Sequence, residues 1–351
     1  MNIEIDMILW NILKYFNNSF DVTETDSIAT FIKETCKCNI EYEEIVKRIN
    51  NIKEYRKQLE YLLTLPQVAQ RSEEWYELRR SCLTASSIAQ AVDKGKYGSS
   101  SQLKRKKAFP EEDIFVKSPP LEWGIRFEQI ASRSYKQRNK DIKLYEFGML
   151  RHPSVFCFGA SPDNISELGI MVEYKCPYKR KINGAIPEEY LMQMQGQMAV
   201  CCLKECDYVE CEIDAYYNDE DYCNKVDDFS DRDHGIVIER FNNDDSEEKY
   251  IYSPEYLTPV KCIEWLDNEK NKLESKLKIH YWKLRKINIM RVNFDEKYWN
   301  ELLPKIIKFW GDVEDLKKTG KIEKNIIDVE ESNNKKNIKY DFLDDDDDTG
   351  I

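Results

Sequence analysis

The 351-residue chain lacks several features that would assign a function class at once. Its three histidines, His152, His234 and His280, are too scattered for a zinc or HNH-type site. No Gly-rich phosphate-cradling loop is present, so an ATP-driven helicase or nuclease is not supported. There is no apolar run of membrane-spanning length, and the opening MNIEIDMILW has no basic cluster typical of a secretory signal. We therefore expect an intracellular protein.

Paired cysteine motifs are also missing. The chain has 11 cysteines but no Cys-x-x-Cys pair. Cys201 and Cys202 fall in a predicted helix, and Cys211 falls in a predicted strand, which favours reduced core thiols over an iron–sulfur cluster.

Net positive charge is lacking, because 65 acidic residues outnumber 53 basic ones and give a net charge of −12. The acid is concentrated in two blocks, residues 214–248 and the Asp-rich end from Asp341 onward. The remainder is mildly basic, so the overall charge does not exclude a nucleic-acid partner.

The pattern of apolar residues predicts an α/β core with helical additions. The core shows the order helix, strand, strand, strand, helix, strand. We expect a loop over "KGKYGSSSQLKRKK", a hairpin that joins the strands "SVFCFGA" and "GIMVEYKC" through the turn "NISELG", and helices over most of 255–318. The expected regions are an N-terminal helical region 1–66, a core 67–252 with an acidic excursion 218–248, a C-terminal helical region 253–318, and a disordered acidic tail 319–351.

Chemistry is concentrated in the stretch "GASPDNISELGIMVEYKCP". Glu173 and Lys175 alternate on one face of a strand, and a hairpin would bring Asp163 beside Glu173. Two close carboxylates repel each other unless a cation lies between them, and oxygen ligands suit Mg²⁺ or Mn²⁺. The alternative is a structural Glu173–Lys175 ion pair in which Asp163 serves the turn.

Other segments add polar groups to this stretch. Glu128 lies on an otherwise apolar helical face and offers a third carboxylate. Gln193 and Gln197 are four residues apart on one helix face, where amides can hold water or phosphate oxygens. Arg79 and Ser86 offer a guanidinium and a helix-start hydroxyl, which are both good phosphate partners.

Taken in order, these blocks resemble the lambda-exonuclease family, also called YqaJ-like viral recombinases, within the PD-(D/E)XK nuclease superfamily. The resemblance runs from about Arg71 to Tyr217. It is carried by "EEWYELRRSCLTASSIA", "LEWGIRFEQIASRSY", "SPDN", "VEYKCP" and "YLMQMQGQM". Where relatives often have Gly after Pro-Asp, this chain has Asn164, which tolerates the same left-handed turn conformation.

The resemblance implies a mixed central sheet flanked by helices and a metal-dependent DNA exonuclease. Asp163, Glu173, Glu128 and the main-chain carbonyl of Tyr174 would bind Mg²⁺ or Mn²⁺, and Lys175 would be the catalytic lysine. Gln193 would position water or substrate. In the same reading, Arg79 and Ser86 would hold a DNA phosphate.

The resemblance also implies a biological setting. The substrate would be the ends of double-stranded DNA, degraded 5′ to 3′ in viral recombination, repair or replication, with a single-strand annealing protein as a partner and a homo-oligomer as a further option. The location would be host cytoplasm, nucleus or virion. Two alternatives stay open: a catalytically inactive nuclease-fold DNA-binding or scaffold protein, and an endonuclease or junction resolvase of the same superfamily.

Overall fold

The computed structural model describes residues 6, 8, 9, 11, 12, 25–35, 40–110, 118–227, 233–241, 249–273 and 276–319. The expected disordered tail therefore lies outside the described residues, apart from Thr319. Residues 228–232 and 242–248 of the expected acidic excursion lie outside them as well.

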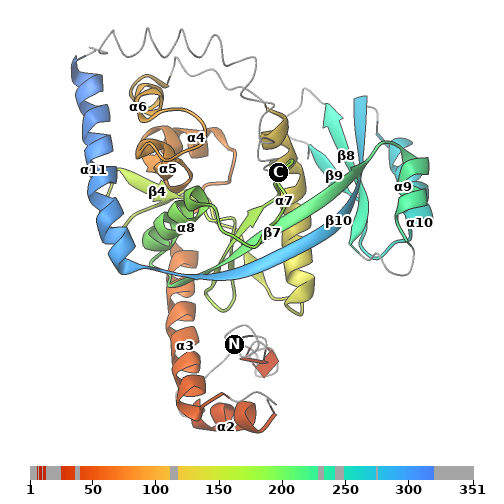
Figure 1. The fold of residues 1–351 in the computed structure, drawn as a ribbon, viewed down its shortest axis with the longest axis horizontal. Coiled ribbons are helices and arrows are strands. Elements are labelled where there is room, and N and C mark those ends of the chain that lie inside the picture. The colour runs from red at the N-terminus through yellow and green to blue at the C-terminus, as the bar shows by residue number, and fades with distance from the viewer. Residues whose placement is uncertain are drawn as a thin grey trace, which may run out of the picture.

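A seven-stranded mixed sheet forms the centre of the molecule (Figure 1). Only the central neighbours β6 and β7 run parallel, and every other neighbouring pair in this sheet is antiparallel. The order is β2 (Leu144–Tyr145), β5 (Asn164–Ser166), β6 (Met171–Lys175), β7 (Glu205–Tyr216), β10 (Lys276–Asn293), β8 (His234–Phe241) and β9 (Tyr250–Tyr252). A second sheet has the order β1 (Leu83–Thr84), β4 (Phe158–Ala160) and β3 (Leu150–Arg151).

Helices cover both faces of the seven-stranded sheet. The described helices are α2 (Thr25–Thr35), α3 (Tyr42–Thr64), α4 (Glu73–Arg80), α5 (Ile88–Ala91), α6 (Ser100–Ala108), α7 (Pro119–Arg138), α8 (Glu188–Cys201), α9 (Asp219–Lys225), α10 (Pro259–Lys270) and α11 (Glu296–Thr319), with a 3₁₀ turn over Ala85–Ser87. Along β6, Met171 joins the core cluster under α8 and α11, while Val172 and Tyr174 join the cluster under α7 and α3. This alternation confirms the mixed α/β fold. None of the described helices is long and apolar enough to cross a bilayer.

The expectation of continuous helix through the segment before Asn293 is wrong. Residues 276–293 form the long strand β10, which pairs with β7 on one side and β8 on the other. Leu277, Ile279 and Tyr281 alternate with polar residues as a strand requires, but a register shift between Leu284 and Lys286 interrupts this alternation. The C-terminal region is therefore tied into the core sheet by backbone hydrogen bonds.

The basic segment "SSQLKRKK" is also not the expected loop. It forms α6, which Ser99 caps through a reciprocal pair of hydrogen bonds with Gln102. Lys104 Nζ contacts Asp312 Oδ2 of α11 at 2.8 Å, so the helix is docked on its neighbour. The sequence carried the capping signal, and the Gly/Ser-rich stretch before it obscured the helix.

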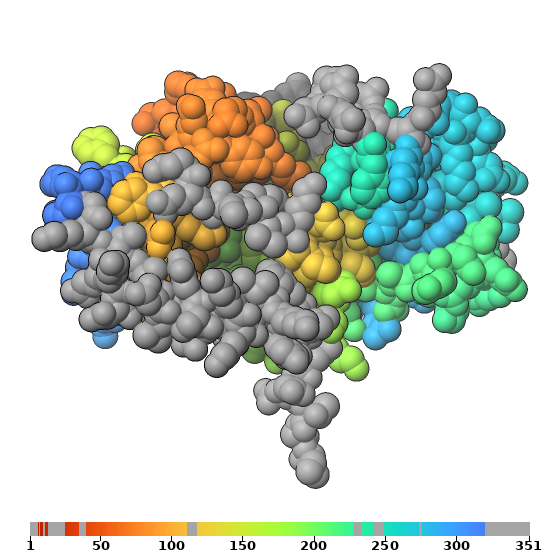
Figure 2. Space-filling model, turned by 90° about the horizontal axis from the view of Figure 1, so that it is seen from above, coloured from red at the N-terminus to blue at the C-terminus, as the bar shows by residue number. Residues whose placement is uncertain are grey.

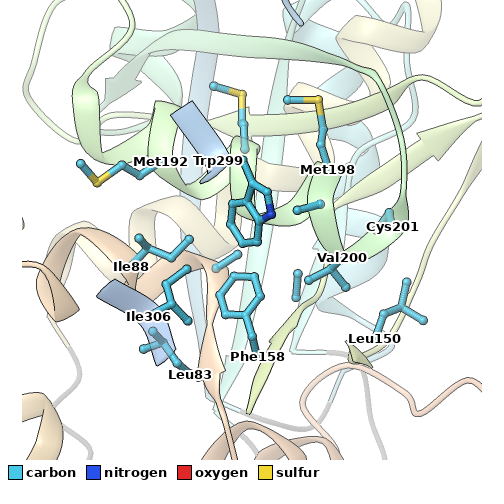
Figure 3. Packing of buried hydrophobic residues seen from close by; sticks show 14 of the residues in the cluster. Leu83, Ile88, Leu150, Phe158, Met192, Met198, Val200, Cys201, Trp299 and Ile306 are labelled. Carbon is cyan, nitrogen blue, oxygen red and sulfur yellow. The ribbon is translucent and has the colours of Figure 1, made fainter. Parts of the chain in front are cut away.

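The core under α8 holds the strand that leads into the candidate site (Figure 3). Trp299 of α11 lies against Phe158 of β4, with ring centroids 5.6 Å apart. A Cβ at Gly196 would lie 2.5 Å from Ile88 Cδ1 and 3.0 Å from Phe158 Cζ, so a larger residue would require these side chains to shift. This packing fixes the position at which the chain leaves β4 and the distance between α8 and β4.

Candidate active site

Asp163 lies in the connection between β4 and β5, one residue before β5 begins. The hairpin that brings it to Glu173 is β5–β6, so the sequence-based pairing of "SVFCFGA" with "GIMVEYKC" is wrong by one strand. The turn between β5 and β6 needs a positive φ, which Gly169 supplies at 73°. Asp163 Oδ2 accepts a hydrogen bond of 2.8 Å from the backbone N–H of Tyr174, which fixes the carboxylate beside β6.

Glu173 is the buried centre of the site, with 1% of its surface exposed. Its Oε1 accepts hydrogen bonds from Lys175 Nζ and Gln193 Nε2, both at 2.6 Å. Its Oε2 accepts one from Gln197 Nε2 at 2.8 Å. The predicted shared face of Glu173 and Lys175 is therefore present, and α8 contributes two of its three glutamine amides to the same carboxylate.

The acids of the site repel one another. Burial, followed by the charges of Glu173 and Glu128, raises the pKa of Asp163 well above its ordinary value. Burial alone would lower the pKa of Lys175, but the charges of Glu173 and Asp163 outweigh it and raise that pKa. Lys175 is thus an ammonium group across the neutral pH range. Lys175 and, beside Glu128, Arg71 face three acids, so the acids outnumber the cations.

Glu128 reaches the site from α7, where its side chain is 39% exposed. Its carboxylate lies 3.6 Å from a guanidinium nitrogen of Arg71. Partial burial and the charge of Glu173 raise the pKa of Glu128, whereas Arg71 and Lys175 act in the opposite direction. The third carboxylate expected from the sequence is therefore close enough to feel the other two.

The chemistry of these groups fits a hard divalent cation, although their present positions do not form a ligand sphere. Carboxylate and carbonyl oxygens are the donors that Mg²⁺ and Mn²⁺ prefer, and the mutual repulsion of Asp163, Glu173 and Glu128 is what a cation would relieve. Among the described residues, no three His, Cys, Asp or Glu side chains come close enough together to hold a metal ion. Lys175 and the two glutamine amides occupy the oxygens of Glu173 instead.

A second polar group lies along α4. Arg79 NH2 donates to Ser86 Oγ at 3.4 Å, and its guanidinium lies 4.3 Å from the ring centroid of Trp75. Trp75 Nε1 donates to Ser161 Oγ at 3.0 Å, two residues before Asp163. The predicted Arg79–Ser86 pair is therefore formed, and a single indole ring separates it from the Pro-Asp loop.

Three contributors were missed by sequence reasoning. Arg71 contacts Glu128, Trp75 supports both Arg79 and the loop before Asp163, and Tyr190 lies with its ring centroid 4.9 Å from Lys175 Nζ. Trp75 and Arg79 are four residues apart in α4, a spacing that places both side chains on one side of the helix, whereas Arg71 lies in the turn before α4. That spacing was the available signal for Trp75.

The site lies beneath one face of the molecule. Figure 2 shows the orange segment around α4 and α5 on one side of α7 and the green-to-blue lobe of α9, α10 and β8 on the other. The lobe has its own small core, which includes Tyr222, Ile236 and Leu266.

The central part of the chain matches a known protein family. Residues 74–204 match the YqaJ-like viral recombinase domain family. The match includes every site residue predicted from the sequence and confirms the family resemblance over this segment. An uncharacterized protein of Acanthamoeba polyphaga mimivirus is 26% identical over 339 residues, covering 81% of this chain and 61% of its own length. The chain thus spans about 61% of that viral relative.

Solved structures similar to this chain include two exonucleases. An alkaline exonuclease from Laribacter hongkongensis has 18% identity and a TM-score of 0.45, covering 70% of this chain and 95% of that one. A phage-related exonuclease from Haemophilus somnus has 12% identity and a TM-score of 0.38, covering 66% and 91%.

Proposed function

We propose that the chain is a metal-dependent DNA exonuclease that hydrolyses phosphodiester bonds, 5′ to 3′, on linear double-stranded DNA. One observation carries the proposal: Lys175 and Glu173 share a hydrogen bond on one strand face while the acids Asp163 and Glu128 raise the local negative charge beside them. A purely structural ion pair between Glu173 and Lys175 would not need two further acids, because their negative charges repel Glu173. The match to a viral recombinase domain and the mimivirus relative support a role in viral DNA recombination, repair or replication.

The residues of the candidate active site would have separate roles in metal binding, charge stabilisation and water positioning. Asp163, Glu173, Glu128 and the Tyr174 carbonyl would hold Mg²⁺ or Mn²⁺. When bound, the ion polarises the phosphate and lowers the pKa of a bound water. Lys175, charged at neutral pH, donates a hydrogen bond to a phosphate oxygen and offsets the charge that builds there. Gln193 and Gln197 hold Glu173 in one orientation, and Gln193 is near enough to guide the attacking water.

Recognition of a DNA end is assigned to α4 and the turn after it. Arg79 and Ser86 already share a hydrogen bond, and a phosphate would replace that weak contact with charge-assisted bonds. Because Trp75 joins Arg79 to the loop before Asp163, a phosphate bound there would set the distance from the strand end to the acids. The product would be a substrate for a single-strand annealing protein, and homo-oligomerisation would serve processive digestion.

Digestion of end-labelled linear duplex DNA with Mg²⁺ tests the proposal. We expect loss of linear DNA, faster from 5′-phosphate than from 5′-hydroxyl ends, and no cleavage of a covalently closed circle. Lys175→Ala should reduce the rate by at least about 100-fold, the scale of one lost electrostatic donor. Lys272→Ala, which removes an exposed charge just after α10, is the control and should retain most activity.

Two other outcomes would replace the proposal. Nicking of the closed circle would indicate an endonuclease or junction resolvase that uses the same acids. DNA binding without cleavage of any substrate would indicate a catalytically inactive nuclease-fold scaffold.

A further inference from the structure

The chain leaves the candidate active site through a loop, residues 176–187, that begins directly after Lys175 and ends at α8. Its first part is held against α7. Cys176 Sγ donates to the backbone carbonyl of Phe127 at 3.5 Å. The ring of Tyr178 packs edge-on against Trp123, with centroids 5.3 Å apart. The start of the loop is therefore fixed relative to the helix that carries Glu128.

The middle of the loop is anchored on the sheet. Arg180 forms an ion pair with Glu210, which is fully buried and is the register partner of Lys175 on β7. Tyr208 donates a second hydrogen bond to Glu210 at 2.9 Å. A carboxylate buried this deeply is stable only when it is paired, so Arg180 cannot leave it without a large penalty.

The end of the loop has two further attachments at Ile182, which is 5% exposed. Its N–H donates to Glu212 Oε2 at 3.3 Å, and its carbonyl accepts from Lys286 Nζ at 3.0 Å. Contacts with α7, β7 and β10 thus hold a segment that has no regular secondary structure of its own.

Between these inward-facing anchors the loop presents a different set of side chains to solvent. Lys179 and Lys181 are exposed on either side of Arg180, and Tyr178 is 40% exposed next to them. Two cations and an aromatic ring therefore lie on an anchored loop within a few residues of Lys175. Lysine ammoniums bind backbone phosphates, and an aromatic face accepts an unpaired base.

We propose that the loop 176–187 is a binding site for the DNA strand beside the scissile phosphate, with Lys179 and Lys181 on backbone phosphates and Tyr178 stacked on an unpaired base. This inference rests on the proposed function and adds the strand contacts at the same site. Because the loop is anchored before DNA arrives, binding does not have to order it, which conserves affinity.

The test measures binding without turnover, on a duplex with a single-stranded tail, in EDTA and over a range of salt concentrations. For the double variant Lys179→Gln/Lys181→Gln we expect the slope of log K against log salt to fall by about 1.4–1.8, as two lost phosphate contacts require. The control Lys270→Gln/Lys272→Gln removes two exposed charges at the end of α10 and should leave the slope unchanged. Tyr178→Leu should weaken binding of the tailed duplex at least about fivefold, whereas Tyr217→Leu, at an almost fully exposed tyrosine, should not.

The two proposals fail in different ways. If wild type binds and cleaves DNA but the lysine pair leaves the slope unchanged, the loop proposal is overturned and the nuclease stands. If wild type binds no DNA, both are overturned. Equal loss of slope in the α10 control would also overturn the loop proposal, because the charge effect would then be general.

Discussion

Two clusters of charged side chains are built around the strands of the seven-stranded sheet, and their charges affect the pKa values of their acids in opposite ways. The first, which we call the ion lock, joins the N-terminal segment, α3, β7 and β10; its members are Asp6, Arg48, Glu205, Asp207 and Arg291. The second, the acid site, consists of Glu128, Asp163, Glu173 and Lys175. In the lock, two guanidiniums form hydrogen-bonded ion pairs with all three carboxylates. In the acid site, Lys175 hydrogen-bonds Glu173, Arg71 lies 3.6 Å from Glu128, and Asp163 accepts its hydrogen bond from a backbone N–H.

The pKa shifts record this difference. Burial works against ionisation of Glu205, but the hydrogen bonds from Arg48 and the charge of Arg291 outweigh it and lower the pKa of Glu205. In the acid site, burial and neighbouring acids act together and raise the pKa values of Asp163 and Glu128. The lock therefore stabilises the fold in its ionised state, while the acid site opposes folding until a cation binds. A cluster in which neighbouring acids raise one another's pKa values indicates a functional site better than the presence of buried charge alone does.

Breaking the lock should have the largest effect on stability. Arg291→Met removes a guanidinium that contacts Asp6, Glu205 and Asp207, and leaves buried carboxylates without compensation. We expect a loss of about 3–5 kcal/mol in the free energy of unfolding, measured by urea denaturation. Arg285→Met is the matched control on β10: its ion pairs with Glu212 and Asp214 are exposed, so the loss should stay below about 1 kcal/mol. Equal losses would show that the lock is no stronger than a surface pair.

A divalent cation should have the next largest effect, and only through the acid site. At about 100 times its dissociation constant, an ion that binds the folded state alone adds about 2.7 kcal/mol of stability. We expect Mg²⁺ or Mn²⁺ to raise the Tm of the wild type and to have little effect on Asp163→Asn. Asp214→Asn, which removes a carboxylate of an exposed ion pair on β7, should retain the full response. A response that survives Asp163→Asn would place the cation elsewhere.

The sequence predicted the acid site better than the lock, for a physical reason. Asp163, Glu173 and Lys175 lie within thirteen residues, and strand alternation alone puts Glu173 and Lys175 on one face. By contrast, Arg291 and Asp6 are 285 residues apart, and no local pattern links them. Their contact depends on β10 being a strand, which the register shift between Leu284 and Lys286 concealed. Local periodicity predicts which side chains of a hairpin share a face, but it does not predict the long-range strand pairing that holds the sheet together.

Removing one carboxylate should reveal the electrostatic repulsion within the acid site. Asp163→Asn should abolish cleavage and raise the free energy of unfolding at pH 7 by about 1 kcal/mol, within the range of such trades between activity and stability. Since the folded-state pKa of Asp163 is raised, the wild type loses stability as pH rises from the ordinary value of an aspartate through that raised pKa. The advantage of the variant should therefore vanish in acid and grow toward neutral pH, as thermal melting over a pH series would show.

Glu205→Gln is the control with the opposite sign. The pKa of Glu205 is lowered, so its ionised form stabilises the fold above the ordinary value of a glutamate, and that contribution is lost as pH falls. This variant should be less stable than the wild type at neutral pH, with the gap closing in acid. Parallel pH curves for the two variants would contradict the distinction between the lock and the acid site.

The smallest expected effect tests whether the lock is redundant. Tyr135 donates a hydrogen bond of 2.7 Å to Asp207 Oδ2, and Arg291 holds the same carboxylate with Nε on Oδ1 and NH2 on Oδ2. Because two guanidinium bonds remain, Tyr135→Phe should cost about 0.5 kcal/mol, at the low end for a hydrogen bond. Tyr174→Phe, which removes the hydroxyl that donates to the neutral amide oxygen of Asn164 at 2.9 Å, is the control without a charged acceptor. If Tyr135→Phe instead cost more than about 2 kcal/mol while Tyr174→Phe did not, the arginines alone would not balance the acids of the lock, and the two buried groups would differ in degree rather than in kind.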